Sequence, residues 1–134
     1  MNKHEEIINS LIKNFISLGN VAVERSIVLK FSEKYRPDLL IENISSGKKV
    51  VIEVKNNDKN LNISLGTLSF LTDLKQFLDT MNNYKFIVIF TDDLTPNFTK
   101  LISGRITYYS LKENSIESIA KFIYETILPD NTLS

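Results

Sequence analysis

The sequence predicts an α/β domain in which a mixed β-sheet is flanked by helices, in the order α-β-β-β-α-β-α-β-α. Apolar residues recur at helical spacing near the start, in the middle and near the end of the chain. The runs between these segments are short and rich in branched apolar residues, as strands are. Because the 134 residues contain no repeat and no Pro-, Gly- or Ser-rich linker, residues 1–134 are expected to form one domain.

The first half of the chain predicts a helix followed by three strands. These elements cover residues 3–18, 21–31, 37–43 and 48–56. The first is helical because six apolar residues share one face, and Gly19 is suited to follow its end. Pro37 suits the start of a strand, and Ser45-Ser46-Gly47 predicts a hairpin turn between the second and third strands.

The second half predicts three helices that alternate with two strands. These elements cover residues 65–81, 85–90, 96–103, 106–111 and 114–128. Leu65 begins a series of apolar residues three or four positions apart, which predicts the first of these helices. Thr95 followed by Pro96 predicts a helix start, and Asn114 with Glu117 predicts a capping box for the last helix.

Residue composition excludes several kinds of site. The chain has no cysteine, which rules out disulfides and thiolate zinc sites and fits a reducing cytoplasm. The only histidine is His4, so a catalytic triad or a histidine-rich metal cage is excluded. A metal would have to be held by oxygen ligands, which favours Mg²⁺ or Mn²⁺. His4 lies on the apolar side of the first helix, near its start, and is interpreted as a packing or end-capping residue.

No membrane segment is expected. No apolar run approaches the roughly 20 residues that a bilayer requires. Residues 1–6 are polar and do not resemble a signal or transit peptide. These features predict a cytoplasmic protein.

Charge is distributed unevenly, although the net charge is zero. Between Arg25 and Lys59 there are eight basic residues and five acidic ones, whereas the chain from Ser110 onward has two lysines and four acids. A basic region attracts a phosphate backbone, and a merely solvated surface is the alternative. The residues predicted to contact nucleic acid are Lys34, Arg36, Lys48 and Lys59.

The strongest chemical signal comes from Asp38, Glu53 and Lys55. Residues i and i+2 of a strand share a face, so Glu53 and Lys55 project together, and the hairpin brings Asp38 beside them. Asp38, Glu53 and the backbone carbonyl of Val54 would hold a hard cation, which activates water for phosphodiester hydrolysis. Lys55 would position that water and offset charge on the phosphate.

This segment resembles the PD-(D/E)XK nuclease superfamily, which includes restriction endonucleases and archaeal-type Holliday junction resolvases. The match is literal at Pro37-Asp38 and at Glu53-Val54-Lys55, and the element order over residues 3–92 agrees with it. The stretch 19–26 is similar to the resolvase-like branch. The resemblance implies a restriction endonuclease-like sheet and Mg²⁺-dependent cleavage of DNA, often by a homodimer.

The same resemblance implies a catalytic glutamate on the first helix. Glu5 lies at the border of the apolar face, whereas Glu6 points away from it, so Glu5 is the predicted residue. Glu24 in the first strand is a reserve candidate.

Other polar and aromatic residues have simpler interpretations. Asp92-Asp93 are interpreted as turn residues, and one of Tyr108 and Tyr109 is expected to face the core, although either ring could stack on a base. For the whole chain, the alternative to a nuclease is a catalytically degenerate module of the same fold that binds nucleic acid or a protein.

Overall fold

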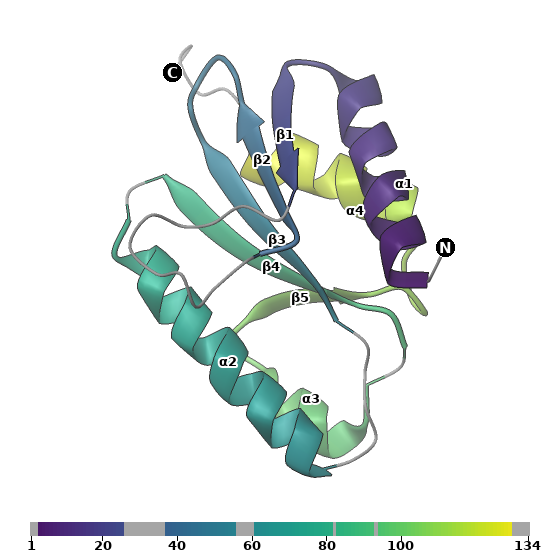
Figure 1. Cartoon of the computed structure of the whole chain (residues 1–134), viewed down its shortest axis with the longest axis vertical. Coiled ribbons are helices and arrows are strands. Elements are labelled where there is room, and N and C mark those ends of the chain that lie inside the picture. The colour runs from purple at the N-terminus through teal and green to yellow at the C-terminus, as the bar shows by residue number, and fades with distance from the viewer. Residues whose placement is uncertain (1–2, 26–36, 56–60, 82, 93, 130–134) are drawn as a thin grey trace.

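The computed structural model describes residues 3–25, 37–55, 61–81, 83–92 and 94–129, which form a five-stranded sheet with helices on both faces (Figure 1). Its elements are α1 (Lys3–Leu18), β1 (Val21–Arg25), β2 (Leu39–Asn43), β3 (Lys49–Lys55), α2 (Leu61–Asp79), β4 (Tyr84–Phe90), α3 (Pro96–Ile102), β5 (Thr107–Ser110), α4 (Ile116–Phe122) and the π-helical segment η1 (Ile123–Ile127). The strands lie in the order β1-β2-β3-β4-β5. β1, β2 and β3 are antiparallel, and β3, β4 and β5 are parallel. The predicted mixed sheet and element order are confirmed.

The sheet separates two hydrophobic cores. α1 and α4 cover one face and α2 and α3 cover the other (Figure 1). Side chains along β3 alternate between the two cores: Val50, Ile52 and Val54 lie in the first core and Val51 lies in the second. β4 is buried on both faces, as its continuous apolar run predicts.

A tight turn joins β2 to β3 and sets the register of the hairpin. Gly47 adopts φ +77°, a conformation that a side chain disfavours, and its N–H donates to the carbonyl of Asn43 at 2.9 Å. Leu39 then lies opposite Ile52. This register determines which residues meet at the far end of the hairpin.

One local prediction differs from the structure. The helix α4 is capped by Ser115, whose side chain accepts from the Ser118 N–H, so the predicted Asn114–Glu117 capping box is wrong. Of the apolar residues whose spacing predicts α2, Leu65 is 45% exposed, whereas Leu68, Leu71, Leu74 and Leu78 are buried. The first strand is described only as Val21–Arg25, and the rest of the predicted segment lies outside the described residues.

The helices that the structure describes include none with both the length and the apolar character needed to cross a bilayer.

Candidate active site

The β2–β3 hairpin brings the two predicted carboxylates together at the end opposite its turn. Continuing the register by one residue from Leu39 and Ile52 places Asp38 opposite Glu53. The backbone N–H of Asp38 donates to Glu53 Oε1 at 2.9 Å, and the backbone N–H of Val54 donates to Asp38 Oδ2 at 2.8 Å. The backbone of each strand therefore orients the carboxylate that the other strand carries.

The carbonyl oxygen of Val54 lacks a backbone donor from the neighbouring strand. In an antiparallel hairpin, residues directly opposite each other alternate between pairs that exchange backbone hydrogen bonds and pairs that do not. Asn43 and Lys48 form a hydrogen-bonded pair, because the Asn43 N–H donates to the Lys48 carbonyl. Counting along the register in steps of two residues, Pro37 and Val54 occupy the position of another such pair. Proline has no N–H, so Pro37 cannot donate to the Val54 carbonyl. Pro37 therefore leaves a strand carbonyl free of its ladder bond beside the two carboxylates.

Burial alters the acidity of Glu53. The residue is 3% exposed, and this desolvation, reinforced by the negative charge of Asp38, raises the pKa of Glu53 from 4.5 to about 7. The Lys55 ammonium and the hydrogen bond from the Asp38 N–H act in the opposite direction but do not offset the increase. A buried carboxyl with such a pKa, next to a second carboxylate, is expected where a proton or a cation completes a site.

Lys55 places its ammonium group beside Glu53. Its Nζ lies 3.5 Å from Glu53 Oε2 and 4.9 Å from the ring centroid of Phe70, on α2. The Lys55 side chain is 35% exposed, so the ammonium is held by two contacts and is still accessible to a substrate. The predicted projection of Glu53 and Lys55 to one side of β3 is consistent with this contact.

His4 reaches the same cluster from α1, a contact that its interpretation as a packing or end-capping residue did not include. Its Nε2 lies 3.0 Å from the carbonyl oxygen of Val54 and 3.3 Å from Asp38 Oδ2. The periodicity of α1 places His4 on the apolar face, but nothing in the neighbouring sequence indicates that the start of this helix lies against the end of β3. His4 is therefore the residue of this cluster that sequence reasoning missed.

The helix glutamates have other contacts. Glu5 forms an ion pair with Arg25 of β1, and Glu6 is exposed. The assignment of Glu5 to the catalytic group stays a prediction. The reserve candidate Glu24 is exposed on β1. At the end of β4, Asp92 accepts from the Thr91 hydroxyl at 3.3 Å and pairs with α1 through Lys3.

Both tyrosines of β5 contact the hydrophobic cores. Tyr108 packs edge-to-face against Phe90 on one side of the sheet, and Tyr109 packs in the same way against Phe122 on the other. The expectation that one of them faces the core is confirmed, and the second behaves similarly.

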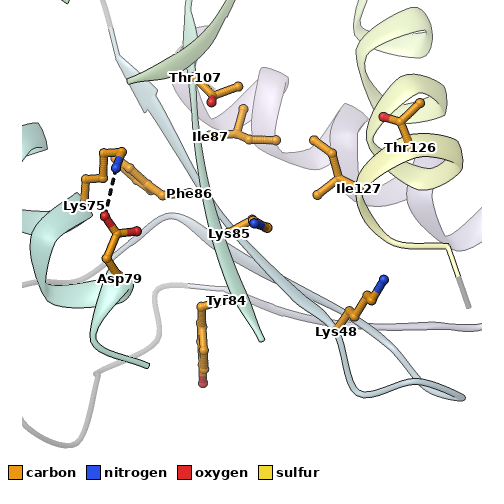
Figure 2. A pocket seen from close by; sticks show the side chains of 10 residues that line it. All are labelled: Lys48, Lys75, Asp79, Tyr84, Lys85, Phe86, Ile87, Thr107, Thr126 and Ile127. Carbon is orange, nitrogen blue, oxygen red and sulfur yellow. Dashed lines mark hydrogen bonds and ion pairs between the residues drawn. The ribbon is translucent and has the colours of Figure 1, made fainter. Parts of the chain in front are cut away.

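Of the four predicted nucleic-acid contacts, Lys34, Arg36 and Lys59 lie outside the described residues. Lys48 lies at the hairpin turn, five residues before Glu53, which along a strand corresponds to roughly 17 Å. It lines a cavity of about 460 Å³ at this other end of the sheet. Figure 2 shows Lys48 and Lys85 on the side of β4 that faces η1. Lys48 therefore does not join the carboxylates.

The donor set suits a hard cation. Asp38, Glu53 and the Val54 carbonyl offer oxygen ligands, which Mg²⁺ and Mn²⁺ accept. In the described part of the chain, no three His, Asp or Glu side chains are grouped as a ready-made metal cage. The Val54 carbonyl, which lacks a backbone donor and contacts His4 Nε2, would add a third oxygen ligand to such a site.

Comparison with solved structures identifies the fold. A complex of EndoMS with double-stranded DNA matches at a TM-score of 0.51 and 16% identity, over 83% of this chain and 45% of that chain. AF1548, a protein of unknown function, matches at 0.52 and 11%, over 96% and 70%. A repair endonuclease from Pyrococcus abyssi matches at 0.48 and 18%, over 83% and 48%. No protein-family model and no curated protein matches the sequence.

The EndoMS and AF1548 likenesses show that the chain shares the fold of these two proteins, which is consistent with the restriction endonuclease-like sheet that its sequence predicts. The chain spans less than half the length of the EndoMS chain that it matches. The fold alone assigns no activity, so the functional argument depends on the residues of the site.

Proposed function

We propose that this chain is a metal-dependent endonuclease that hydrolyses phosphodiester bonds in DNA. The observation that carries the proposal is the convergence of Asp38, Glu53 and the Val54 carbonyl beside the Lys55 ammonium. Oxygen donors that hold a hard cation, together with a cationic side chain, suit phosphodiester hydrolysis, because they activate water and stabilise the charge that develops on the phosphate. The DNA in the EndoMS complex supports DNA as the substrate.

The residues of the site have distinct roles in this proposal. Asp38, Glu53 and the Val54 carbonyl hold Mg²⁺, for which Mn²⁺ substitutes. When bound, the cation polarises the scissile phosphate and lowers the pKa of a water molecule. Lys55, fixed between Glu53 and the Phe70 ring, positions that water and offsets negative charge on the phosphoryl oxygens. The buried side chains of β3 keep these groups in place before substrate arrives.

A cleavage screen tests this function. Purified protein is incubated with labelled junction, flap, linear and single-stranded DNA, and with matched RNA, in Mg²⁺, in Mn²⁺ and in excess chelator. We expect cleavage of at least one DNA substrate that stops with chelator and resumes when metal is restored. We also propose structure-selective cutting, and strict dependence on one linear sequence would contradict that part of the proposal.

One observation favours a second candidate, a degenerate module that binds DNA or a protein without cutting. Both oxygens of Glu53 already contact groups of the protein, and the described residues include no ready-made cage of three metal-binding side chains. This candidate predicts binding with no metal-dependent product. Turnover that is abolished by Asp38→Asn would exclude it.

The cavity at the turn end of the hairpin supports a prediction about DNA affinity. Within the described residues, neither Lys48 nor Lys85 has an ion-pair partner. If both contact phosphates, the double variant Lys48→Ala/Lys85→Ala lowers the slope of log affinity against log salt by about 2. Fluorescence anisotropy at several salt concentrations measures this slope. The control is Lys13→Ala/Lys121→Ala, which removes two exposed lysines of α1 and α4, and an equal loss of slope in both variants would contradict the prediction.

The homodimer that the resemblance implies stays a proposal. Light scattering of the purified chain measures its mass in solution, and a mass near 15.4 kDa at assay concentration would contradict it.

A further inference from the structure

A further cavity lies at the carboxyl end of β5, on the same side of the molecule as the candidate active site. It has a volume of about 390 Å³ and is lined by Leu94, Thr99, Tyr108, Ser110 and Glu113. This volume is typical of small-ligand sites, which span roughly 300–1,000 Å³. None of the lining residues belongs to the proposed metal centre, so the cavity is a separate feature of this end of the sheet.

The register of the sheet places this cavity close to Lys55. Lys55 lies opposite Phe90 of β4, and Phe90 lies opposite Ser110 of β5. Neighbouring strands are about 4.8 Å apart, so the backbones of Lys55 and Ser110 are roughly 10 Å apart. Lys55 and Phe90 project to the face that α2 and α3 cover. Tyr108 projects to the same face, and Ser110, two residues later, therefore does so as well.

Two polar groups of the cavity have hydrogen-bonding capacity that the described part of the chain does not use. Ser110 is 7% exposed, and its Oγ accepts from the Lys112 N–H at 3.2 Å, but no described residue accepts its hydroxyl proton. Glu113 is exposed, and its carboxylate has no partner among the described residues. Buried hydroxyls normally find an acceptor, so Ser110 indicates where a bound group completes the site.

The walls of the cavity suit a flat ring. The Tyr108 ring is held edge-to-face against Phe90, with ring centroids 6.0 Å apart, and Leu94 adds an apolar surface. Nucleobases stack on such aromatic side chains. The Thr99 hydroxyl already donates to the Thr95 carbonyl at 3.0 Å, so it can only accept. The cavity therefore combines a stacking surface with one buried donor and several acceptors.

The Glu113 carboxylate determines which base fits best. Of the four DNA bases, guanine has two adjacent donors on one edge, N1–H and the N2 amine, and a carboxylate accepts from both. Cytosine occupies this edge in a duplex, so only an unpaired guanine presents it.

We propose that the cavity binds an unpaired guanine next to the scissile phosphate, with Glu113 accepting from N1–H and the N2 amine; this inference rests on the proposed nuclease function. Tyr108 stacks on the base, and the Ser110 hydroxyl donates to one of its acceptor atoms. The backbone separation of roughly 10 Å allows a nucleotide that adjoins a phosphate at Lys55 to reach the cavity. The substrate is thus DNA that is single-stranded at this nucleotide.

A single exocyclic amine tests this contact. Two cleavage-resistant oligothymidylates carry either one guanine or one hypoxanthine, which lacks only the N2 amine, and their affinities are measured by fluorescence anisotropy in Mn²⁺. We expect the parent to bind the guanine oligonucleotide on the order of tenfold more tightly. Glu113→Ala is expected to bind both equally. Glu117→Ala, which removes another exposed acid four residues later, is expected to keep the preference.

The control separates base recognition from general charge. Each variant removes one negative charge, so a change in attraction to phosphates affects both oligonucleotides alike and leaves their ratio unchanged. Equal affinity of the parent for the two oligonucleotides, or a guanine preference that persists in Glu113→Ala, overturns the inference and leaves the proposed nuclease function standing. If the parent binds neither oligonucleotide but cleaves DNA in the screen, the inference alone fails. Absence of both binding and cleavage overturns both proposals.

Discussion

Replacing Lys55 by alanine is expected to slow DNA cleavage by about 10²- to 10³-fold, the usual loss when one group that stabilises developing charge is removed. The Lys55 ammonium is held 3.5 Å from Glu53 Oε2 and over the Phe70 ring, so its position does not depend on substrate. The cleavage rate is measured under single-turnover conditions with saturating Mn²⁺ at about pH 8. High pH is needed because Lys55 lowers the pKa of Glu53, and its loss makes that carboxyl harder to ionise.

The same strand provides a matched control for this variant. Lys49 lies at the other end of β3, where it pairs with Glu42 at 3.7 Å and covers the ring of Tyr84 at 5.4 Å. Lys49→Ala removes an equivalent strand lysine with an equivalent acidic and aromatic neighbour. We expect this variant to cleave DNA within a few-fold of the parent rate. Equal losses in the two variants would show that Lys55 acts through strand stability rather than through the reaction.

Replacing Glu53 by glutamine is expected to abolish cleavage and to stabilise the metal-free protein above pH 7. Burial raises the pKa of Glu53 from 4.5 to about 7 in the folded state, so the folded protein holds this proton more tightly than the unfolded chain. Below pH 4.5 both states are protonated and Glu53 has no effect. Between pH 4.5 and about 7 the stability falls as pH rises, and above that range the full cost, roughly 3 kcal/mol, is present.

Urea unfolding in chelator between pH 4.5 and 8 measures this effect. Glutamine keeps an oxygen that accepts the Asp38 N–H but carries no charge, so the pH-dependent loss seen in the parent is expected to disappear. Glu42→Gln is the control, because Glu42 also pairs with a lysine of β3 but its side chain is 37% exposed. If the difference between the parent and Glu53→Gln does not grow with pH, the account of Glu53 is wrong.

The positive charge of a cation would offset this cost of ionising Glu53. Functional sites commonly lower the stability of a fold in this way. Because a metal competes with the proton on Glu53, metal affinity is also expected to fall as pH drops below about 7.

Periodicity predicted most of the fold, because the sheet is built from local patterns. Alternation along β3 identifies which residues face each core, and Gly19 and Gly47 both adopt the positive φ values that end α1 and turn the hairpin. Errors arose where two neighbouring residues offer the same chemistry. Both Asn114 and Ser115 can cap a helix, and only the geometry selects Ser115.

The candidate site was predictable only in part, since it combines local and distant contacts. Asp38, Glu53 and Lys55 lie on one hairpin, so their proximity follows from its register. His4 is separated from Val54 by 50 positions, and its place depends on how α1 packs on the sheet. Lys48 was predicted to contact nucleic acid, and it lies far from the carboxylates because the turn and the open end of an antiparallel hairpin are at opposite ends.

The most direct test of the metal centre is the binding of Mn²⁺ and Mg²⁺ to the parent and to Asp38→Asn, measured by calorimetry at about pH 8 with a cleavage-resistant DNA present. Asparagine keeps an oxygen that accepts the Val54 N–H, so the hairpin is expected to keep its geometry while it loses one anionic ligand. The account predicts one bound metal ion in the parent and a large loss of affinity in the variant. Equal binding by the two proteins, or none by either, would contradict it.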